Sequence, residues 1–143
     1  MTDKRTFHWP WPDVPAETLL QRARGVAERA YAPYSNFKVG AALLTSDGSV
    51  VLGCNVENAS YGMSICAERS AVVSMIAMGH LDPVAIAVVG GRSGTPCPPC
   101  GACRQVLAEF NPDMLVVLES PNRIIVMNVN ELLPLSFSLT ERT

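Results

Sequence analysis

The chain is organised around two short segments, Ile65-Cys66-Ala67-Glu68-Arg69 and Pro99-Cys100-Gly101-Ala102-Cys103-Arg104-Gln105. Together they supply three thiols with the spacing of zinc ligands. Cys100 and Cys103 can meet on one side of the first turn of a helix, because they are three positions apart. Cys66 stands directly before a mostly apolar or small run, residues 67–78, that is typical of a buried helix. Both helices would then begin at one metal ion, where the positive end of a helix dipole favours thiolates.

The number of ligands separates a structural zinc site from a catalytic one. Structural sites usually have four protein ligands, whereas hydrolytic sites have three and a water molecule. The two segments offer three cysteines and also Glu68, a carboxylate that can move protons beside a metal-activated water. On a regular helix residues 66 and 68 would point about 200° apart, so they converge only if Cys66 lies at the very start of the turn. The pattern predicts a catalytic zinc site with one open position.

Two arginines directly follow key positions of these segments, Arg69 after Glu68 and Arg104 after Cys103. Three thiolates give a divalent ion a net negative centre, which weakens its pull on water. We predict that both arginines donate hydrogen bonds to the sulfurs and restore that pull. The alternative for either one is an ordinary surface charge.

A fourth cysteine, Cys97, allows an alternative interpretation of the metal site. Cys97-Pro98-Pro99-Cys100 is also a Cys-x-x-Cys motif and could close a four-cysteine site in a zinc-stapled binding module without catalysis. Prolines have no amide hydrogen to donate to a sulfur, and Glu68 would then have no water to act on. We therefore predict that Cys97 lies outside the metal site.

These residues resemble a known family, the zinc-dependent nucleoside and nucleobase deaminases. Cys66-Ala67-Glu68 and the segment 99–105 are similar to the three-cysteine branch, the small homotetrameric cytidine deaminases. Branches that act on nucleic acid have histidine in place of Cys66, and neither His8 nor His80 lies in such a motif. The resemblance covers roughly residues 13–138.

The resemblance implies hydrolysis of cytidine or 2′-deoxycytidine to uridine or 2′-deoxyuridine with release of ammonia, in pyrimidine salvage, with one Zn²⁺ per chain. Glu68 would pass a proton from the zinc-bound water to N3, the hydroxide would attack C4, and the same carboxylate would help ammonia leave. Ala67 would offer backbone groups to the base. A deaminase of a modified nucleoside such as blasticidin S shares the zinc motifs and stays an alternative.

Further residues are candidates for holding the substrate. Asn55 and Glu57 are two apart in an extended segment, so they share one side, as paired hydroxyl groups of a ribose would require. The resemblance implies that they hold the sugar and that Phe37, by default a core residue, is an aromatic wall beside the pyrimidine. It also implies that Phe137 lies over the base from another subunit and that the segment around Tyr61 works across an interface. Packing within one chain would explain these two aromatics equally well.

The length and composition of the chain limit which partners it can bind and in which compartment it is expected to be found. The length of 143 residues is typical of one domain, and a net charge of −2 gives no electrostatic footprint for nucleic acid or an anionic membrane. No stretch approaches the roughly 20 apolar residues that span a bilayer, and residues 1–5 lack the apolar core of a signal peptide. Five cysteines, three of them clustered, indicate metal binding in a reducing compartment, which predicts a cytoplasmic protein. A hydrophobic content of 48%, high for this size, adds to the expectation of a homotetramer with active sites completed by neighbouring subunits.

Patterns along the chain predict its elements. Residues 1–12, an extension containing Trp9-Pro10-Trp11-Pro12, are expected to be irregular, with the tryptophans covering an apolar surface. Asp13 is expected to cap a helix that has Pro15 in its first turn and that Pro33 ends. The later elements are expected to be a hairpin of strands at 37–45 and 49–54, helices at 66–79 and 100–110, and strands at 83–89, 114–118 and 124–127.

The order of these elements predicts the fold. The continuous apolar run at 83–89 is typical of a strand that is covered on both faces. Alternation of helix and strand favours parallel pairing through right-handed crossovers. We therefore expect a single domain, 1–143, with a three-layer α/β/α sandwich around a mixed sheet of five strands.

Overall fold

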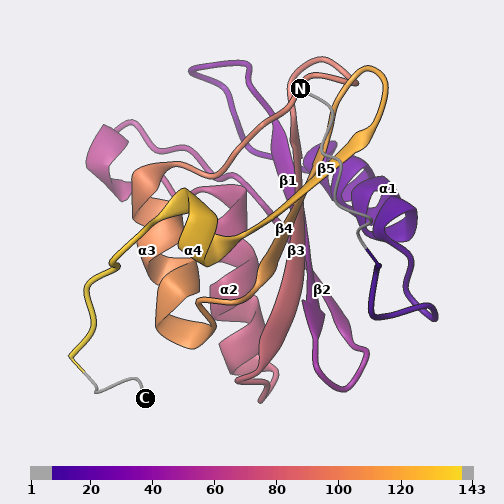
Figure 1. Ribbon diagram of the computed structural model, residues 1–143. Coiled ribbons are helices and arrows are strands. Elements are labelled where there is room, and N and C mark those ends of the chain that lie inside the picture. Colours follow the sequence, from indigo (N-terminus) through magenta and orange to yellow (C-terminus); the bar gives the residue numbers. More distant parts are fainter. Residues whose placement is uncertain (1–7, 140–143) are drawn as a thin grey trace.

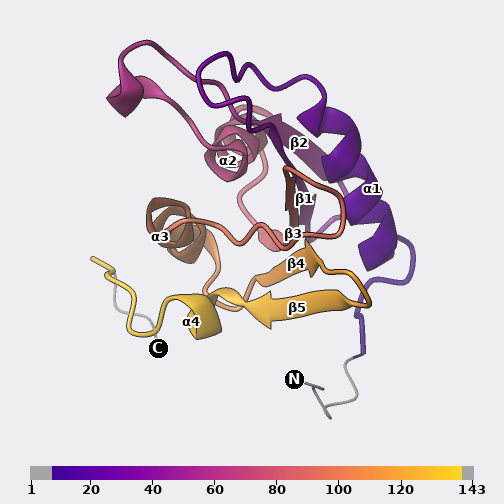
Figure 2. The ribbon, with the colours of Figure 1, turned by 90° about the horizontal axis from the view of Figure 1, so that it is seen from above.

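A five-stranded sheet forms the centre of the protein, in the order β2-β1-β3-β4-β5 (Figure 1). The computed structural model describes residues 8–139. The strands are β1 (Val39–Thr45), β2 (Val50–Cys54), β3 (Pro83–Gly90), β4 (Leu115–Glu119) and β5 (Ile124–Asn128). The helices are α1 (Ala16–Ala27), α2 (Ala67–Ala77), α3 (Gly101–Phe110) and α4 (Val129–Leu132), with a 3₁₀ turn, η1, at Tyr61–Met63. Figure 2 shows α1 on one face of the sheet and α2 and α3 on the other, which confirms the three-layer sandwich.

The strand directions agree with a mixed sheet. β1 and β2 form the predicted hairpin, with Ala42 opposite Leu52. β3 pairs antiparallel with β1 and parallel with β4, and α3 carries the chain between the two parallel strands. β5 returns antiparallel to β4. The parallel pairing expected from helix and strand alternation is therefore confirmed for β3 and β4, while both edges of the sheet are antiparallel.

Alternate residues of the central strands pack into two separate hydrophobic cores, one on each face of the sheet. Ile86 and Val88 of β3 pack toward α2 and α3, whereas Ala87 and Val89 pack toward α1. All of them are completely buried. Because both faces of β3 are covered, the strand is continuously apolar, as its sequence predicted. No helix within residues 8–139 has the length and apolar character to cross a membrane.

Helices lie very close to the sheet at two glycines. A Cβ atom added to Gly40 would lie 2.0 Å from the carbonyl oxygen of Ala23 in α1. One added to Gly53 would lie 2.4 Å from the backbone nitrogen of Ala71 in α2. Only glycine fits at these two crossings, which set the position of each helix against the sheet.

The first helix begins later and ends earlier than its flanking residues suggested. The prediction that Asp13 caps it is wrong, because Pro15 occupies the N-cap position. The helix ends at Ala27, well before Pro33. Tyr31 instead pairs with the segment before α2, donating its amide to the Asn55 carbonyl at 3.0 Å, and this contact draws the chain out of the helix.

The N-terminal tryptophans cover an apolar surface, as predicted. Trp9 and Trp11 pack against the core on the α1 side of the sheet. The indole of Trp9 donates to the carbonyl oxygens of Trp11 at 3.0 Å and Val14 at 2.9 Å, which satisfies its polar atom. The first seven residues of the predicted irregular extension lie outside the described residues.

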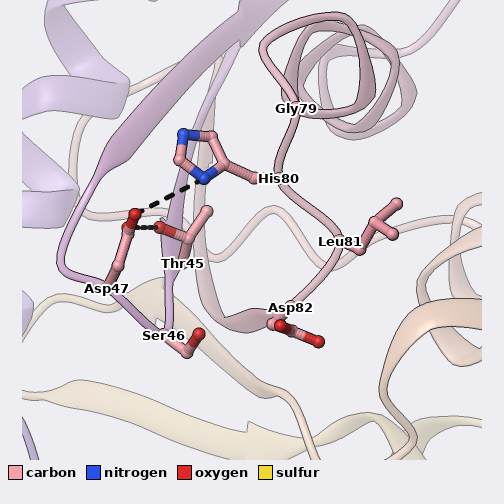
Figure 3. Close-up of a pocket in the computed structure, with 7 residues that line it drawn as sticks. All are labelled: Thr45, Ser46, Asp47, Gly79, His80, Leu81 and Asp82. Atoms are coloured by element: carbon pink, nitrogen blue, oxygen red, sulfur yellow. Dashed lines mark hydrogen bonds and ion pairs between the residues drawn. The ribbon is translucent and has the colours of Figure 1, made fainter.

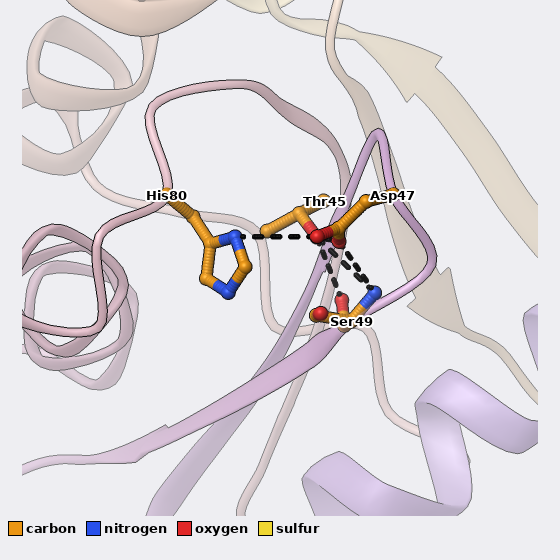
Figure 4. Close-up of polar contacts among 4 residues, drawn as sticks. All are labelled: Thr45, Asp47, Ser49 and His80. Carbon is orange, nitrogen blue, oxygen red and sulfur yellow. Dashed lines mark hydrogen bonds and ion pairs between the residues drawn. The ribbon is translucent and has the colours of Figure 1, made fainter.

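A polar cluster stabilises the turn between β1 and β2 (Figure 4). Asp47 accepts hydrogen bonds from the Thr45 hydroxyl at 2.5 Å and the Ser49 amide at 3.0 Å. These bonds, the one from Thr45 first, lower the pKa of Asp47 to about 2. His80, just beyond the end of α2, lies with its Nδ1 3.6 Å from the carboxylate. A small hollow lies at the opposite end of α2 from Cys66 (Figure 3), and it is lined by Thr45, Ser46, Asp47, Gly79, His80, Leu81 and Asp82.

Candidate active site

Three cysteine sulfurs converge where α2 and α3 begin. The Sγ atoms of Cys66, Cys100 and Cys103 all lie within 4.8 Å of one another, and they form the only such group of potential metal ligands within residues 8–139. Cys66 is the N-cap of α2 and Cys100 the N-cap of α3, with Cys103 in the first turn of α3. Both helices thus direct their free amide groups toward one cluster, as the sequence pattern predicted.

The backbone at Cys66 brings the first thiol and Glu68 together. Cys66 has extended dihedral angles, φ −73° and ψ 156°, and lies just outside the helix that contains Glu68. The two side chains are therefore not held on opposite sides of a regular helix. Cys103 forms a hydrogen bond with the Glu68 carboxyl group, which places that group beside the sulfurs.

Glu68 is a buried carboxyl group, with only 4% of its surface exposed. Burial raises its pKa, while hydrogen bonds from its own backbone amide and from Cys103 and the charge of Arg69 act in the opposite direction. A carboxyl group with a raised pKa can hold and release a proton closer to neutral pH.

The donor set fits a zinc ion. Burial, and next the charge of Glu68, raise the pKa of Cys103, so this thiol would keep its proton unless a cation is present. Three thiols in one cluster suit a borderline-soft divalent ion that binds sulfur, and three protein ligands leave one position of a tetrahedral ion free. Cys66, Cys100 and Cys103 are the residues that would hold the ion.

The two arginines predicted to support the cluster have different surroundings. Arg69 lies with Nη2 3.7 Å from the Cys66 sulfur and 3.5 Å from the Ser64 carbonyl oxygen. The prediction that Arg104 donates to a sulfur is wrong. Its guanidinium group donates to the carbonyl oxygens of Pro99 and Leu132, each at 2.8 Å. Arg104 therefore fastens the residue before Cys100 to the end of α4.

Cys97 lies outside the three-sulfur group. It is half-buried and packs against the core on the α2 and α3 side. Burial, followed by the charge of Glu68, raises the pKa of its thiol to about 11. This arrangement argues against a closed site of four cysteines.

Asn55 and Glu57 follow β2, and both form hydrogen bonds with the segment 34–39. The Asn55 amide accepts from the Val39 backbone at 2.8 Å and donates to the Phe37 carbonyl at 2.9 Å. Glu57 accepts from the Tyr34 amide at 2.9 Å and the Ser35 amide at 3.1 Å, and also from the Ser35 hydroxyl. These hydrogen bonds, the Ser35 hydroxyl first, lower the pKa of Glu57.

Ser35 was not identified from the sequence, because it lies 22 positions from Glu57 and no local pattern links them. Its hydroxyl also accepts from the Phe37 amide at 3.0 Å. Ser35 thus connects a carboxylate and an aromatic residue that were both predicted to touch the substrate.

The predicted aromatic residues are largely exposed. Phe37 is 47% exposed and its ring edge lies against Gly90 and Gly91 at the end of β3. Tyr61 and Phe137 are 76% and 69% exposed. The ring of Tyr61 makes an edge contact with Tyr34, and the Phe137 carbonyl accepts from Gln105 in α3. Ala67, between Cys66 and Glu68, is completely buried.

An α/β/α sandwich that presents three thiols and a buried carboxyl group at two helix N-termini defines a class of protein, the zinc-dependent hydrolytic enzymes. The family model described as the cytidine and deoxycytidylate deaminase zinc-binding region matches residues 14–119, and the chain belongs to this family.

Individual relatives agree with this assignment. The chain is 51% identical over 124 residues to a cytidine deaminase of Halalkalibacterium halodurans, an alignment that covers 85% of this chain and 93% of the relative. The crystal structure of a cytidine deaminase from Burkholderia pseudomallei superimposes with a TM-score of 0.79 at 52% identity, over 85% of this chain and 98% of that one. A blasticidin-S deaminase from Bacillus cereus is less similar, at 29% identity over 107 residues that cover 70% of this chain and 76% of the relative.

Proposed function

We propose that this protein hydrolyses cytidine and 2′-deoxycytidine to uridine and 2′-deoxyuridine with release of ammonia. The observation that carries the proposal is the buried Glu68 carboxyl group beside three converging sulfurs. The close similarity to cytidine deaminases supports the choice of substrate. The lower identity to a blasticidin-S deaminase does not favour a modified nucleoside.

Cys66, Cys100 and Cys103 are the proposed zinc ligands, one ion per chain. When bound, zinc supplies a Lewis acid that lowers the pKa of a water molecule toward neutrality. Arg69, beside the Cys66 sulfur, would offset part of the negative charge of three thiolates. Because Cys97 lies outside the cluster, a ligand position stays open for chemistry rather than being closed by a fourth sulfur.

Glu68 is the proposed proton carrier. It takes one proton from the attacking water and delivers it to N3 while the water oxygen bonds to C4. The second proton of that water then passes through the same carboxylate to the exocyclic amino group, the C4–N4 bond breaks, and ammonia leaves. Burial favours this role, because a raised pKa lets the carboxyl group both accept and donate within one turnover.

The remaining site residues hold the nucleoside in this proposal. Asn55 and Glu57 would bind the sugar hydroxyl groups, Phe37 would lie beside the base, and the backbone of Ala67 would contact it. Asn55 still has one N–H and one lone pair of its amide left for a ligand after its two backbone bonds. Ser35 and the Tyr34 amide hold the carboxylate of Glu57 in place.

Tyr61 and Phe137 would act on the site of a neighbouring subunit in a homotetramer. Their exposure supports this proposal, since large aromatic side chains at the surface are enriched in interfaces. We also keep the prediction of a cytoplasmic location, because cysteine ligands must stay reduced to bind metal.

The test is Glu68→Gln, which keeps the size of the side chain and removes its ability to carry a proton. We expect the variant to hold as much zinc as the unaltered protein and to lose about 10²- to 10⁴-fold in cytidine turnover. Ammonia release and zinc content would be measured together, with Glu17→Gln, an exposed glutamate of α1, as the control.

Unchanged turnover by Glu68→Gln would refute its role. Blasticidin S should be offered to the unaltered protein in parallel, since faster turnover of that compound than of cytidine would overturn the proposed substrate.

A further inference from the structure

The proposed mechanism assigns no role to Cys97, although this residue lies close to the site. Its thiol is near enough to Glu68 for the carboxylate charge to raise its pKa. With a pKa of about 11 the thiol stays protonated at neutral pH and behaves as a small apolar group. Cys97 also lies outside the three-sulfur group, so its size and position are what it contributes to the site.

Cys97 and Phe37 meet at the same point, the bare Cα of Gly90 at the end of β3. A Cβ atom added to Gly90 would lie 2.8 Å from the Cys97 sulfur and 3.1 Å from Cε1 of Phe37. One added to Gly91 would lie 2.6 Å from Cε2 of Phe37. The ring and the sulfur therefore form one continuous surface over this glycine pair, which we name the β3-end wall: Phe37, Gly90, Gly91 and Cys97.

The β3-end wall is supported from behind by α1. Arg24 donates to the Gly91 carbonyl oxygen at 3.1 Å, and its guanidinium group also pairs with Glu119 at the end of β4. The glycine pair is thereby tied to a helix and to the neighbouring strand. A wall held in this way resists displacement, so a change in the volume of one of its side chains changes the adjacent space.

We propose that Cys97 is a specificity-determining residue, whose volume sets the space available to the base beside Phe37. This inference rests on the proposed function. In that function C4 must face the metal, N3 must face Glu68, and N1 carries the sugar. Of the other ring positions, C2 carries a polar oxygen, which leaves C5 and C6 for an apolar wall, and a substituent on C5 is the natural probe of the space.

The experiment compares cytidine with 5-methylcytidine in two variants of opposite volume. Cys97→Ala enlarges the space, and we expect it to raise kcat/KM for 5-methylcytidine relative to cytidine by about tenfold. Cys97→Ile reduces the space, and we expect a decrease of similar size. These values are at the low end of the discrimination that one methylene group provides in an apolar pocket.

Cys97→Ser is the matched control, because it keeps an atom at the γ position of the side chain while it removes the thiol. It should retain the unaltered substrate ratio and one zinc ion per chain. The ratio of 2′-deoxycytidine to cytidine should stay within about twofold in all three variants, because the wall contacts the base and not the sugar. Should Cys97→Ile fail to fold by circular dichroism, Cys97→Ala alone decides the result.

An active, zinc-loaded enzyme whose 5-methylcytidine ratio does not move in Cys97→Ala would overturn the inference and leave the proposed function standing. A change in the sugar ratio as large as the change in the base ratio would overturn it as well. Absence of cytidine turnover by the unaltered, zinc-loaded protein would instead refute the proposed function.

Discussion

At Cys66 a single change of backbone direction decides whether a thiol and a carboxyl group can act together. Residues two apart on a helix diverge, but Cys66 is extended and Glu68 helical, so both side chains reach the same cluster. The close approach of α2 to the sheet is a second constraint on these two residues. Gly53 of β2 lets the first turns of α2 approach the sheet, and therefore contributes to the position of both residues.

We expect Gly53→Ala to destabilise the protein by about 3 kcal/mol or more, the upper part of the range for overpacked sites. Its Cβ would lie 2.4 Å from the Ala71 nitrogen and 2.5 Å from the Ala67 carbonyl oxygen, and both atoms belong to the backbone of α2. Urea unfolding of the zinc-loaded protein would measure the loss.

Gly25→Ala is the control for this substitution. Gly25 lies on α1 with no heavy atom within 4 Å of an added Cβ, so alanine should stabilise the helix by about 0.5 to 1 kcal/mol. Small and equal effects of the two substitutions would show that α2 is not held by this contact.

The helices and strands whose boundaries depend on neighbouring residues in the sequence were predictable. The continuous run of β3 identified a strand covered on both faces, and the helix starts at Cys66 and Cys100 followed from small and apolar residues after each thiol. The end of α1 was not predictable, because a distant pairing of Tyr31 with residue 55 decides it. The spacing in the sequence identified the three sulfurs, whereas one of the two partners of Arg104, Leu132, lies 28 positions away and could not be read from it.

The Asp47 carboxylate in the turn between β1 and β2 makes the stability of the protein depend on pH. The pKa of Asp47 is lowered from 3.8 to about 2, so the folded state favours its charged form. The stabilising effect is complete above pH 3.8 and is lost as the pH falls through about 2. We expect Asp47→Asn to have a lower urea midpoint than the unaltered protein at pH 7, and the gap to close toward pH 2.

Acid protonates the cysteine ligands of the variant and of the unaltered protein alike. The difference between their urea midpoints therefore reports on Asp47 alone. Asp82→Asn is the matched control, since Asp82 lines the same hollow but its carboxylate points away from Asp47 (Figure 3). It should leave the midpoint nearly unchanged at every pH. A gap for Asp47→Asn that stays constant down to pH 2 would contradict the assignment of the effect to this carboxylate.

For the whole molecule, exposed apolar side chains support the proposed association of several chains. The turn η1 and the C-terminal segment both stand out beyond α2 and α3 in Figure 2. These two segments contain Tyr61 and Phe137, and the outer face of α2 adds Val73 and Ile76, also exposed. Large exposed apolar side chains in one region are typical of a surface that a partner covers.

If Phe137 acts on the site of a neighbouring subunit, two damaged variants should restore each other. Glu68→Gln chains lack the proton carrier but keep the aromatic ring, while Phe137→Ala chains keep the carrier and lack the ring. After dissociation and reassembly of an equal mixture, about a quarter of the sites would combine an intact Glu68 with an intact Phe137 by random pairing in a cyclic assembly. Cytidine turnover should then exceed the mean of the two variants reassembled separately, with light scattering showing four chains. Turnover equal to that mean would place Phe137 in the site of its own chain, and a mass of one chain would exclude the assembly.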